Sequence, residues 1–249
     1  MALTVPIQNT LTEVVLISFF LLIILILRNN KSNIRLIFFL LLYGTILEIV
    51  TAVQVKTYTY GAFNLMLFGI PVWVLTSWSL ILYASVKLSN FLVGDKNMRP
   101  VMTGLLALSA DMFMDPVSAH FAFWTWIYSG KGTLMGVPYG NFLGWFLVGA
   151  SFSFVLGKIQ THDTDENSTY LLTTIISSLL IFGFNALKYV PMADELSTIS
   201  FYGVILLSFI LCASRCRLRK PELSEIKTEI SILLFYYIFF IFIFFYGAI

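Results

Sequence analysis

Eight long apolar runs constrain this chain more than any other feature of its sequence. They cover residues 11–27, 34–53, 67–86, 101–115, 141–157, 170–187, 198–214 and 229–248, and the fourth is the shortest. About 20 apolar residues in a helix cross roughly 30 Å of hydrocarbon. Only 11% of the residues are charged, against about a quarter in soluble domains. We therefore predict an all-α integral membrane protein, a bundle of about eight transmembrane helices that forms one domain over residues 1–249.

Lysine and arginine are divided unevenly among the seven connections between these runs. The first, third, fifth and seventh connections carry 12 of the 15, and the other three carry only Lys56, Lys131 and Lys188. Because positive residues collect on the cytoplasmic side, we expect a multi-pass protein of the cell membrane with both termini on the non-cytoplasmic side. The connections 56–64 and 116–140 then share the outer face, and turn residues in 116–140 predict a partly ordered loop that folds back over the bundle.

Several classes of protein and site are disfavoured by the sequence. The net charge of +2 and the scattered basic residues argue against a nucleic-acid partner. The first run lacks a basic segment before it and a small-residue cleavage site, so we expect a retained helix. Cys212 and Cys216 lie one helical turn apart, which suits neither a disulfide nor a structural metal site. No dinucleotide fingerprint, P-loop or aspartate-rich metal motif is present, so neither metal nor cofactor is expected. No clear internal repeat or domain linker is visible.

Acidic residues inside the apolar runs indicate where chemistry can occur, since each such group costs several kcal/mol in hydrocarbon. Glu48 lies in the second run, and Asp111 and Asp115 lie in the fourth. The two aspartates are four residues apart, which places both on one helix face, and Pro116 predicts that the helix ends at or just before Asp115. Close carboxyl groups in a weakly solvated site do not all ionise, so they can supply an acid and a base.

These acids also have structural interpretations, which the sequence leaves open. An aspartate can cap a loop or pair with Lys131, and Glu48 can pair with Lys56 or hydrogen-bond a neighbouring helix. Asn141 opens the fifth run, where capping the helix is its ordinary role. His120 is a lone histidine near the interface, for which a structural or solvated role is favoured over proton transfer.

Aromatic residues are dense between residues 116 and 145. Five of them form either an interfacial belt or the lining of a pocket whose ring faces stabilise a cation. They are Trp124, Trp126, Tyr128, Tyr139 and Trp145.

In these motifs the chain resembles the membrane-bound carotenoid biosynthesis family that includes bacterial acyclic carotenoid hydratases and archaeal bisanhydrobacterioruberin hydratase. The resemblance covers residues 40–150 well and the later helices by hydropathy only. The matching pieces are Glu48 with Tyr58-Thr-Tyr-Gly61, Pro71 with Trp78, Asp111 through Asp115-Pro116, Trp124-Thr-Trp126, and Gly136-Val-Pro138 leading to Asn141-Phe-Leu-Gly-Trp145. The departures are a Phe-Met pair between the aspartates and Met135 in place of an aromatic residue.

The resemblance implies an enzyme that adds water to the terminal double bond of a long acyclic carotenoid and gives a tertiary alcohol. Glu48, Asp111 and Asp115 would be catalytic, and the partners would be the isoprenoid substrate and membrane lipids. The residues expected to contact substrate are Tyr58, Tyr60, Trp78, His120, Trp124, Trp126, Tyr128, Tyr139, Asn141 and Trp145.

Three other functions stay open at this stage. The same chemistry on another prenyl lipid is possible because the sequence does not reveal substrate length. A non-catalytic carotenoid or lipid binder or carrier would use the acids only as hydrogen-bonding groups. A retinal-type photoreceptor needs a lysine deep in a helix, whereas Lys188 lies at the end of a run and fits an interfacial anchor.

Overall fold

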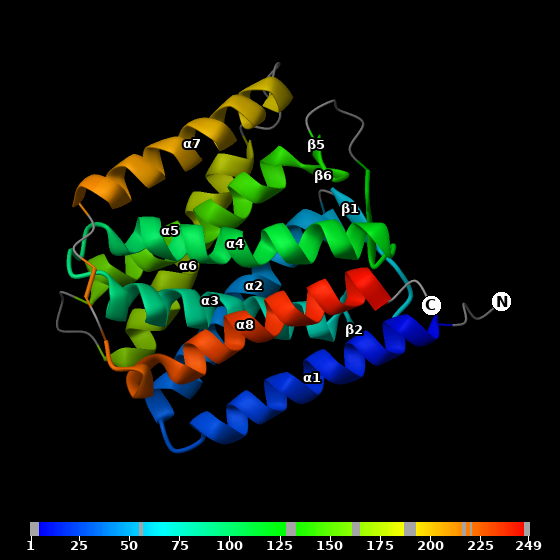
Figure 1. Ribbon diagram of the computed structural model, residues 1–249, viewed down its shortest axis with the longest axis horizontal. Coiled ribbons are helices and arrows are strands. Elements are labelled where there is room, and N and C mark those ends of the chain that lie inside the picture. The colour runs from blue at the N-terminus through cyan, green and yellow to red at the C-terminus, as the bar shows by residue number, and fades with distance from the viewer. Residues whose placement is uncertain are drawn as a thin grey trace.

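The computed structural model describes residues 5–54, 57–127, 133–160, 165–186, 193–215, 218–219 and 221–246. Within these ranges eight α-helices lie side by side (Figure 1). They are α1 (Ile7–Leu27), α2 (Lys31–Glu48), α3 (Val72–Leu92), α4 (Arg99–His120), α5 (Tyr139–Ile159), α6 (Glu166–Ala186), α7 (Ala193–Arg215) and α8 (Leu223–Tyr246). The predicted all-α bundle is confirmed.

Short elements connect these helices at one end of the bundle. A π-helical segment, η1 (Ile49–Gln54), continues α2. The described residues also form the strands β1 (Tyr58–Tyr60), β2 (Met66–Leu67), β3 (Ile70–Pro71), β4 (Trp124–Trp126), β5 (Thr133–Leu134) and β6 (Val137–Pro138).

Six of the helical segments are long and apolar enough to cross a membrane, which makes the chain a multi-pass membrane protein. They are Ile7–Leu27, Lys31–Ala52, Val72–Leu92, Tyr139–Ile159, Glu166–Phe184 and Leu223–Tyr246. The apolar part of α7 is shorter, Thr198–Cys212, and α4 carries the buried acids Asp111 and Asp115.

The start of α1 and the end of α8 lie at the same end of the bundle as the strands (Figure 1). There β1 pairs antiparallel with β4, so that Tyr58 faces Trp126, Thr59 faces Thr125 and Tyr60 faces Trp124. This pairing joins the connections 56–64 and 116–140 and confirms that they lie together. Which side of the membrane they face stays a prediction.

Helix α3 is the central helix of the bundle and packs against α1, α2, α4, α5 and α8. Several of its serine and threonine hydroxyls donate to carbonyls of their own helix, as Ser79 does to Thr76 and Ser85 to Ile81. Small self-satisfied side chains let neighbouring helices approach closely. At the closest point, a Cβ added at Gly44 of α2 would lie 2.9 Å from the Trp78 Cβ of α3.

Two tight hairpins precede helices α3 and α5. Strands β2 and β3 flank Phe68 and Gly69, and strands β5 and β6 flank Met135 and Gly136. All four turn residues have φ between 51° and 84°, as a type I′ turn requires. Gly136 therefore marks a turn, as predicted.

The prediction that Pro116 ends the fourth helix is wrong, because α4 continues to His120. The last turn is held by burial, since Val117 and Ser118 are enclosed by the bundle. The segment that follows α4 is held in place by the Phe123 amide, which donates to the Ser118 carbonyl over 2.8 Å. These contacts outweigh the single backbone hydrogen bond that a proline removes.

Candidate functional site

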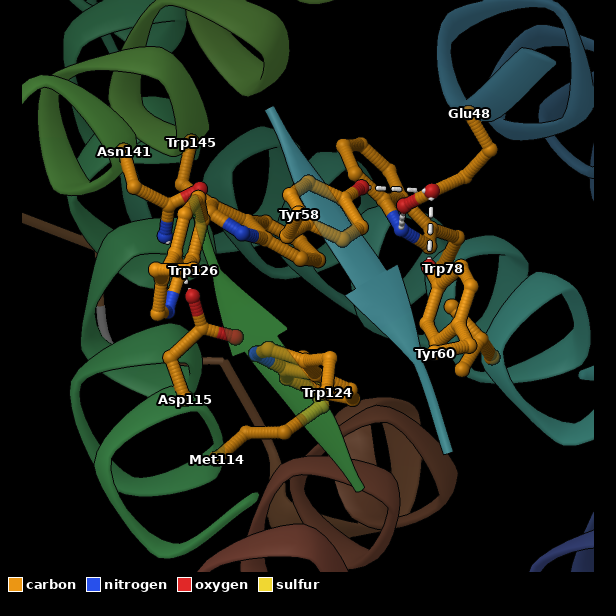
Figure 2. Close-up of a pocket in the computed structure, with 11 residues that line it drawn as sticks. Glu48, Tyr58, Tyr60, Trp78, Met114, Asp115, Trp124, Trp126, Asn141 and Trp145 are labelled. Atoms are coloured by element: carbon orange, nitrogen blue, oxygen red, sulfur yellow. Dashed lines mark hydrogen bonds between the residues drawn. The ribbon is translucent and has the colours of Figure 1, made fainter. Parts of the chain in front are cut away.

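A pocket of about 300 Å³ lies where the strands meet the ends of α2 to α5, and part of that volume is open. Figure 2 shows Glu48 and Asp115 on opposite sides of it, with aromatic side chains of β1 and β4 between them. Its lining residues are Glu48, Tyr58, Tyr60, Val74, Trp78, Met114, Asp115, Trp124, Trp126, Asn141 and Trp145. The pocket therefore has acidic groups from two helices in an aromatic wall.

Glu48 is 3% exposed at the end of α2 and receives three hydrogen bonds. The hydroxyls of Tyr58 and Tyr60 donate to its Oε2 atom over 2.6 and 2.7 Å, and the Trp78 indole Nε1 donates to its Oε1 atom over 2.8 Å. Burial and the neighbouring Glu48 carboxylate raise the pKa of both tyrosine hydroxyls well above the ordinary value. Both phenols therefore remain neutral donors.

Asp111 and Asp115 form a second acidic group on α4, and both are buried. The amide of Asn141 donates to Asp111 Oδ2 over 3.0 Å and also to Asp115 Oδ2. The other oxygen of Asp111, Oδ1, is buried and has no hydrogen-bond partner. In the described part of the chain no lysine or arginine forms an ion pair with either aspartate. Two carboxyl groups thus share one amide.

The walls of the pocket are aromatic ring faces in contact with each other. Trp78 and Trp145 stack with their centroids 4.1 Å apart and an interplanar angle of 19°. Tyr58 meets Trp126 edge to face at 4.9 Å, and Tyr60 meets Trp124 in the same way at 5.9 Å. Trp78, Trp124 and Trp145 are at most 8% exposed, so these three line the pocket and do not form a belt against lipid.

The pocket brings together two of the three acids expected to be catalytic, Glu48 and Asp115, and the Asn141 amide links Asp111 to Asp115. Of the residues expected to contact substrate, His120 and Tyr139 do not line it. His120 is exposed beside Phe121 and Phe244, and the Tyr139 hydroxyl accepts from Tyr202 of α7 over 2.9 Å. Tyr128 lies outside the described residues.

The expectation that Asn141 caps the fifth helix is wrong. Helix α5 begins at Tyr139 after Pro138, and no side chain caps it. Asn141 is therefore already in the first turn, where its amide is free to face Asp111 and Asp115. Glu48 does hydrogen-bond a neighbouring helix, through Trp78. Lys56 and Lys131, the alternative ion-pair partners, lie outside the described residues. So does Lys188, the lysine that was considered for a Schiff base.

The sequence analysis missed two pocket residues and two further buried acids. Val74 and Met114 line the pocket, and ordinary apolar residues carry no signal for such a role. Glu13 accepts from the backbone amides of residues 64 and 65, and Glu229 accepts from the Tyr83 hydroxyl over 3.0 Å. Both acids lie near the ends of apolar runs, where an acidic residue is ordinarily interfacial.

This arrangement suits proton transfer to an apolar substrate. Buried carboxyl groups, which can act as acids and bases, line a pocket beside aromatic rings whose π faces can stabilise a cation. No group of three or more histidine, cysteine, aspartate or glutamate side chains among the described residues is placed to hold a metal ion.

The comparison with protein families gives one match. A family model described as carotenoid biosynthesis protein matches residues 9–210, which include every pocket residue. No curated protein and no solved structure matches the chain.

Proposed function

Because the chain belongs to the carotenoid biosynthesis protein family, we propose that it is a hydratase that adds water to the terminal double bond of a long acyclic carotenoid. A role in carotenoid biosynthesis follows from the family. The reaction rests on one observation, the buried carboxyl groups from α2 and α4 that line a single aromatic pocket. Such groups supply a proton donor and a proton acceptor where a hydrocarbon can reach both.

The proposed reaction proceeds through a tertiary cation. A carboxyl group transfers its proton to the less substituted carbon of the terminal double bond, and the positive charge forms on the carbon that bears two methyl groups. Water adds to that carbon, and a carboxylate takes the excess proton from the new C–O group. The product is a tertiary alcohol, and the two carboxyl groups return to their first state by proton exchange through water.

The aromatic wall and Glu48 support the cationic intermediate. A cation over a tryptophan face gains about 2 kcal/mol or more when desolvated, and the Trp78 and Trp145 rings both line the pocket. A fixed negative carboxylate nearby stabilises developing positive charge without reorganisation. The pocket is small beside a carotenoid, so only the end group enters it, and the polyene lies along the helices in lipid.

We also propose that the pocket faces the non-cytoplasmic side. The strands lie at the end of the bundle where α1 begins and α8 ends (Figure 1), and 12 of the 15 lysine and arginine residues fall in the connections assigned to the opposite end. Alkaline phosphatase fused to the C-terminus should then be active in cells, and a green fluorescent protein fusion should be dark. The reverse pattern would place the pocket on the cytoplasmic side.

Expression in a host that makes acyclic carotenoids tests the reaction. Pigment extracts should contain products heavier by one water, and an empty vector should give none. Glu229→Gln provides a matched control, because it alters a buried glutamate that does not line the pocket. Absence of any hydrated product with several acyclic C40 and C50 substrates would contradict the proposal.

The same extracts separate hydration from simple binding and from chemistry on another prenyl lipid. A carrier would co-purify with unmodified pigment, and Glu48→Gln would change neither the pigment nor its amount. A hydratase of other prenyl lipids would leave carotenoids unchanged but shift the mass of a lipid-extract component by one water.

A further inference from the structure

The segment from α2 to α3 and the segment from α4 to α5 share the same order of elements and the same spacing of key residues. This internal repeat was not predicted from the sequence. In each segment, an acidic residue lies 23 residues before a proline, and a tryptophan lies seven residues after it. The proline ends a type I′ hairpin and directly precedes a helix of 21 residues. The three positions are Glu48, Pro71 and Trp78 in the first half and Asp115, Pro138 and Trp145 in the second.

The contacts between the halves fit a twofold arrangement. The antiparallel pairing of β1 with β4 is centred on Thr59 and Thr125, and Trp78 stacks on Trp145. The outer helices follow the same rule, since α8 packs on α3 and α4 while α6 packs on α5 and α2. Likewise α1 packs on α3 and α2, and α7 packs on α5 and α4. Repeats related by an axis along the membrane normal are known in membrane proteins, with sites at their interface.

The two halves differ at the positions that surround each acid. Gly44 and Val74 of the first half correspond by spacing to Asp111 and Asn141 of the second. As a result Glu48 has three donors and no acidic neighbour on its own helix, whereas Asp115 has a second carboxyl group one turn away and shares one amide with it. Glu48 and Asp115 therefore occupy corresponding positions in the two halves but have different surroundings.

These surroundings favour opposite protonation states. Three neutral donors stabilise a negative charge on Glu48. Asp111 and Asp115 together have one amide, and a buried carboxylate oxygen without a donor is destabilising. A proton held between the two aspartates removes one of the two charges, and the acid that keeps it can donate it.

We infer that the two halves divide the proton transfers, so that Asp115, with Asp111 beside it, protonates the double bond and Glu48 receives the proton from the attacking water. This inference rests on the hydratase proposal. Asp115 breaks its O–H bond as the new C–H bond forms, and Glu48 forms an O–H bond as water adds to the cation. Asp111 is a positioning residue that keeps the donor protonated.

Deuterium exchange distinguishes the two roles. In D2O, a cation formed by addition of a deuteron that then loses a proton returns as a deuterated alkene without being hydrated. The experiment incubates purified wild-type protein and the variants Glu48→Gln and Asp115→Asn in D2O with an acyclic carotenoid, and measures alcohol and deuterated alkene by mass spectrometry. Glu229→Gln serves as the control for loss of a buried carboxylate outside the pocket.

We expect Asp115→Asn to lose both products by about 100-fold or more, since one general acid contributes about 10²–10⁴-fold. Glu48→Gln should lose alcohol but retain exchange, so that the ratio of deuterated alkene to alcohol rises at least about tenfold. If either variant fails to fold, two others replace them. Tyr58→Phe with Tyr60→Phe should raise the ratio, and Asp111→Asn should lower both products together.

A ratio that rises in Asp115→Asn, or that stays constant in every variant, would overturn the division of roles while leaving hydration intact. A wild-type protein that forms neither alcohol nor deuterated alkene would contradict the hydratase proposal itself. The two failures are therefore distinguishable in one experiment.

Discussion

Replacing Tyr58 or Tyr60 by phenylalanine tests how strongly the pocket holds Glu48. Each change removes one hydroxyl that lies 2.6 or 2.7 Å from Glu48 Oε2 and leaves the ring in place. A hydrogen bond to a charged group contributes about 1.5–3 kcal/mol. In a chain of this size each substitution should therefore lower Tm by roughly 5 °C.

The double variant should lose less than the sum of the two single losses. Both hydroxyls serve the same oxygen, and a carboxylate without them takes up a proton, which limits the cost. We expect a coupling energy of about 1 kcal/mol from the double-mutant cycle. Thermal unfolding in detergent, followed by circular dichroism, measures all three variants.

Tyr43→Phe is the matched control, because the buried Tyr43 hydroxyl donates to the neutral Val148 carbonyl over 3.3 Å and lies 3.2 Å from the Ser151 hydroxyl. Its loss should cost about 1 kcal/mol. If Tyr58→Phe and Tyr60→Phe cost no more than Tyr43→Phe, the reasoning that Glu48 is held as an anion by charge-assisted hydrogen bonds is refuted.

Three further predictions follow from the packing and the hydrogen bonds. Gly44→Ala would place a Cβ 2.9 Å from the Trp78 Cβ, so α2 and α3 must separate; we expect a loss of about 1–3 kcal/mol by thermal unfolding and lower alcohol yield. Glu13 accepts hydrogen bonds from two backbone N–H groups through its two carboxylate oxygens, and Glu13→Gln replaces one of these oxygens by an NH2 group that cannot accept. The change should destabilise the fold by about 2 kcal/mol and lower Tm by several degrees. Since the pKa values of Tyr58 and Tyr60 are raised well above 10.0, the two phenols stay neutral when exposed tyrosines ionise; wild type and the double phenylalanine variant should show equal gains in tyrosinate absorbance up to about pH 11.

Each of these predictions has an outcome that contradicts it. Gly144→Ala adds a Cβ with no atom within 4 Å and controls for the added methyl group, so an equal effect of both alanines would rule out the close approach of α2 and α3. An unchanged Tm in Glu13→Gln would show that its contacts do not stabilise the loop. A smaller absorbance gain in the phenylalanine variant would mean that the buried phenols ionise with the others.

The hydrophobic runs were sufficient to predict the helices, because burial in lipid depends on length and composition alone. The same runs did not locate the end of α4, where tertiary contacts around Val117 and Ser118 carry the helix past Pro116. Local propensity describes one segment, whereas these contacts come from residues elsewhere in the chain.

The acids of the pocket were predictable, because a carboxyl group in hydrocarbon is energetically costly and therefore indicates a partner or a function. Their partners were harder to predict. Asn141 has the position of a capping residue in the sequence, and only the hairpin ending at Pro138 shows that α5 begins earlier and turns its amide toward Asp111. The repeat was also hidden, because only a few positions are alike and strand β4 is offset by one residue from the position that corresponds to β1.

In the proposed reaction, carboxyl groups from two helices hydrate an isoprenoid end group. The most direct test incubates the purified, lipid-reconstituted protein with an acyclic carotenoid in ¹⁸O-labelled water and analyses the product by mass spectrometry. Wild type and Glu229→Gln should form a tertiary alcohol whose oxygen comes from the labelled water, and Asp115→Asn should form far less of it. Recovery of unchanged carotenoid from the wild-type protein, or an alcohol without the label, would contradict the proposed reaction.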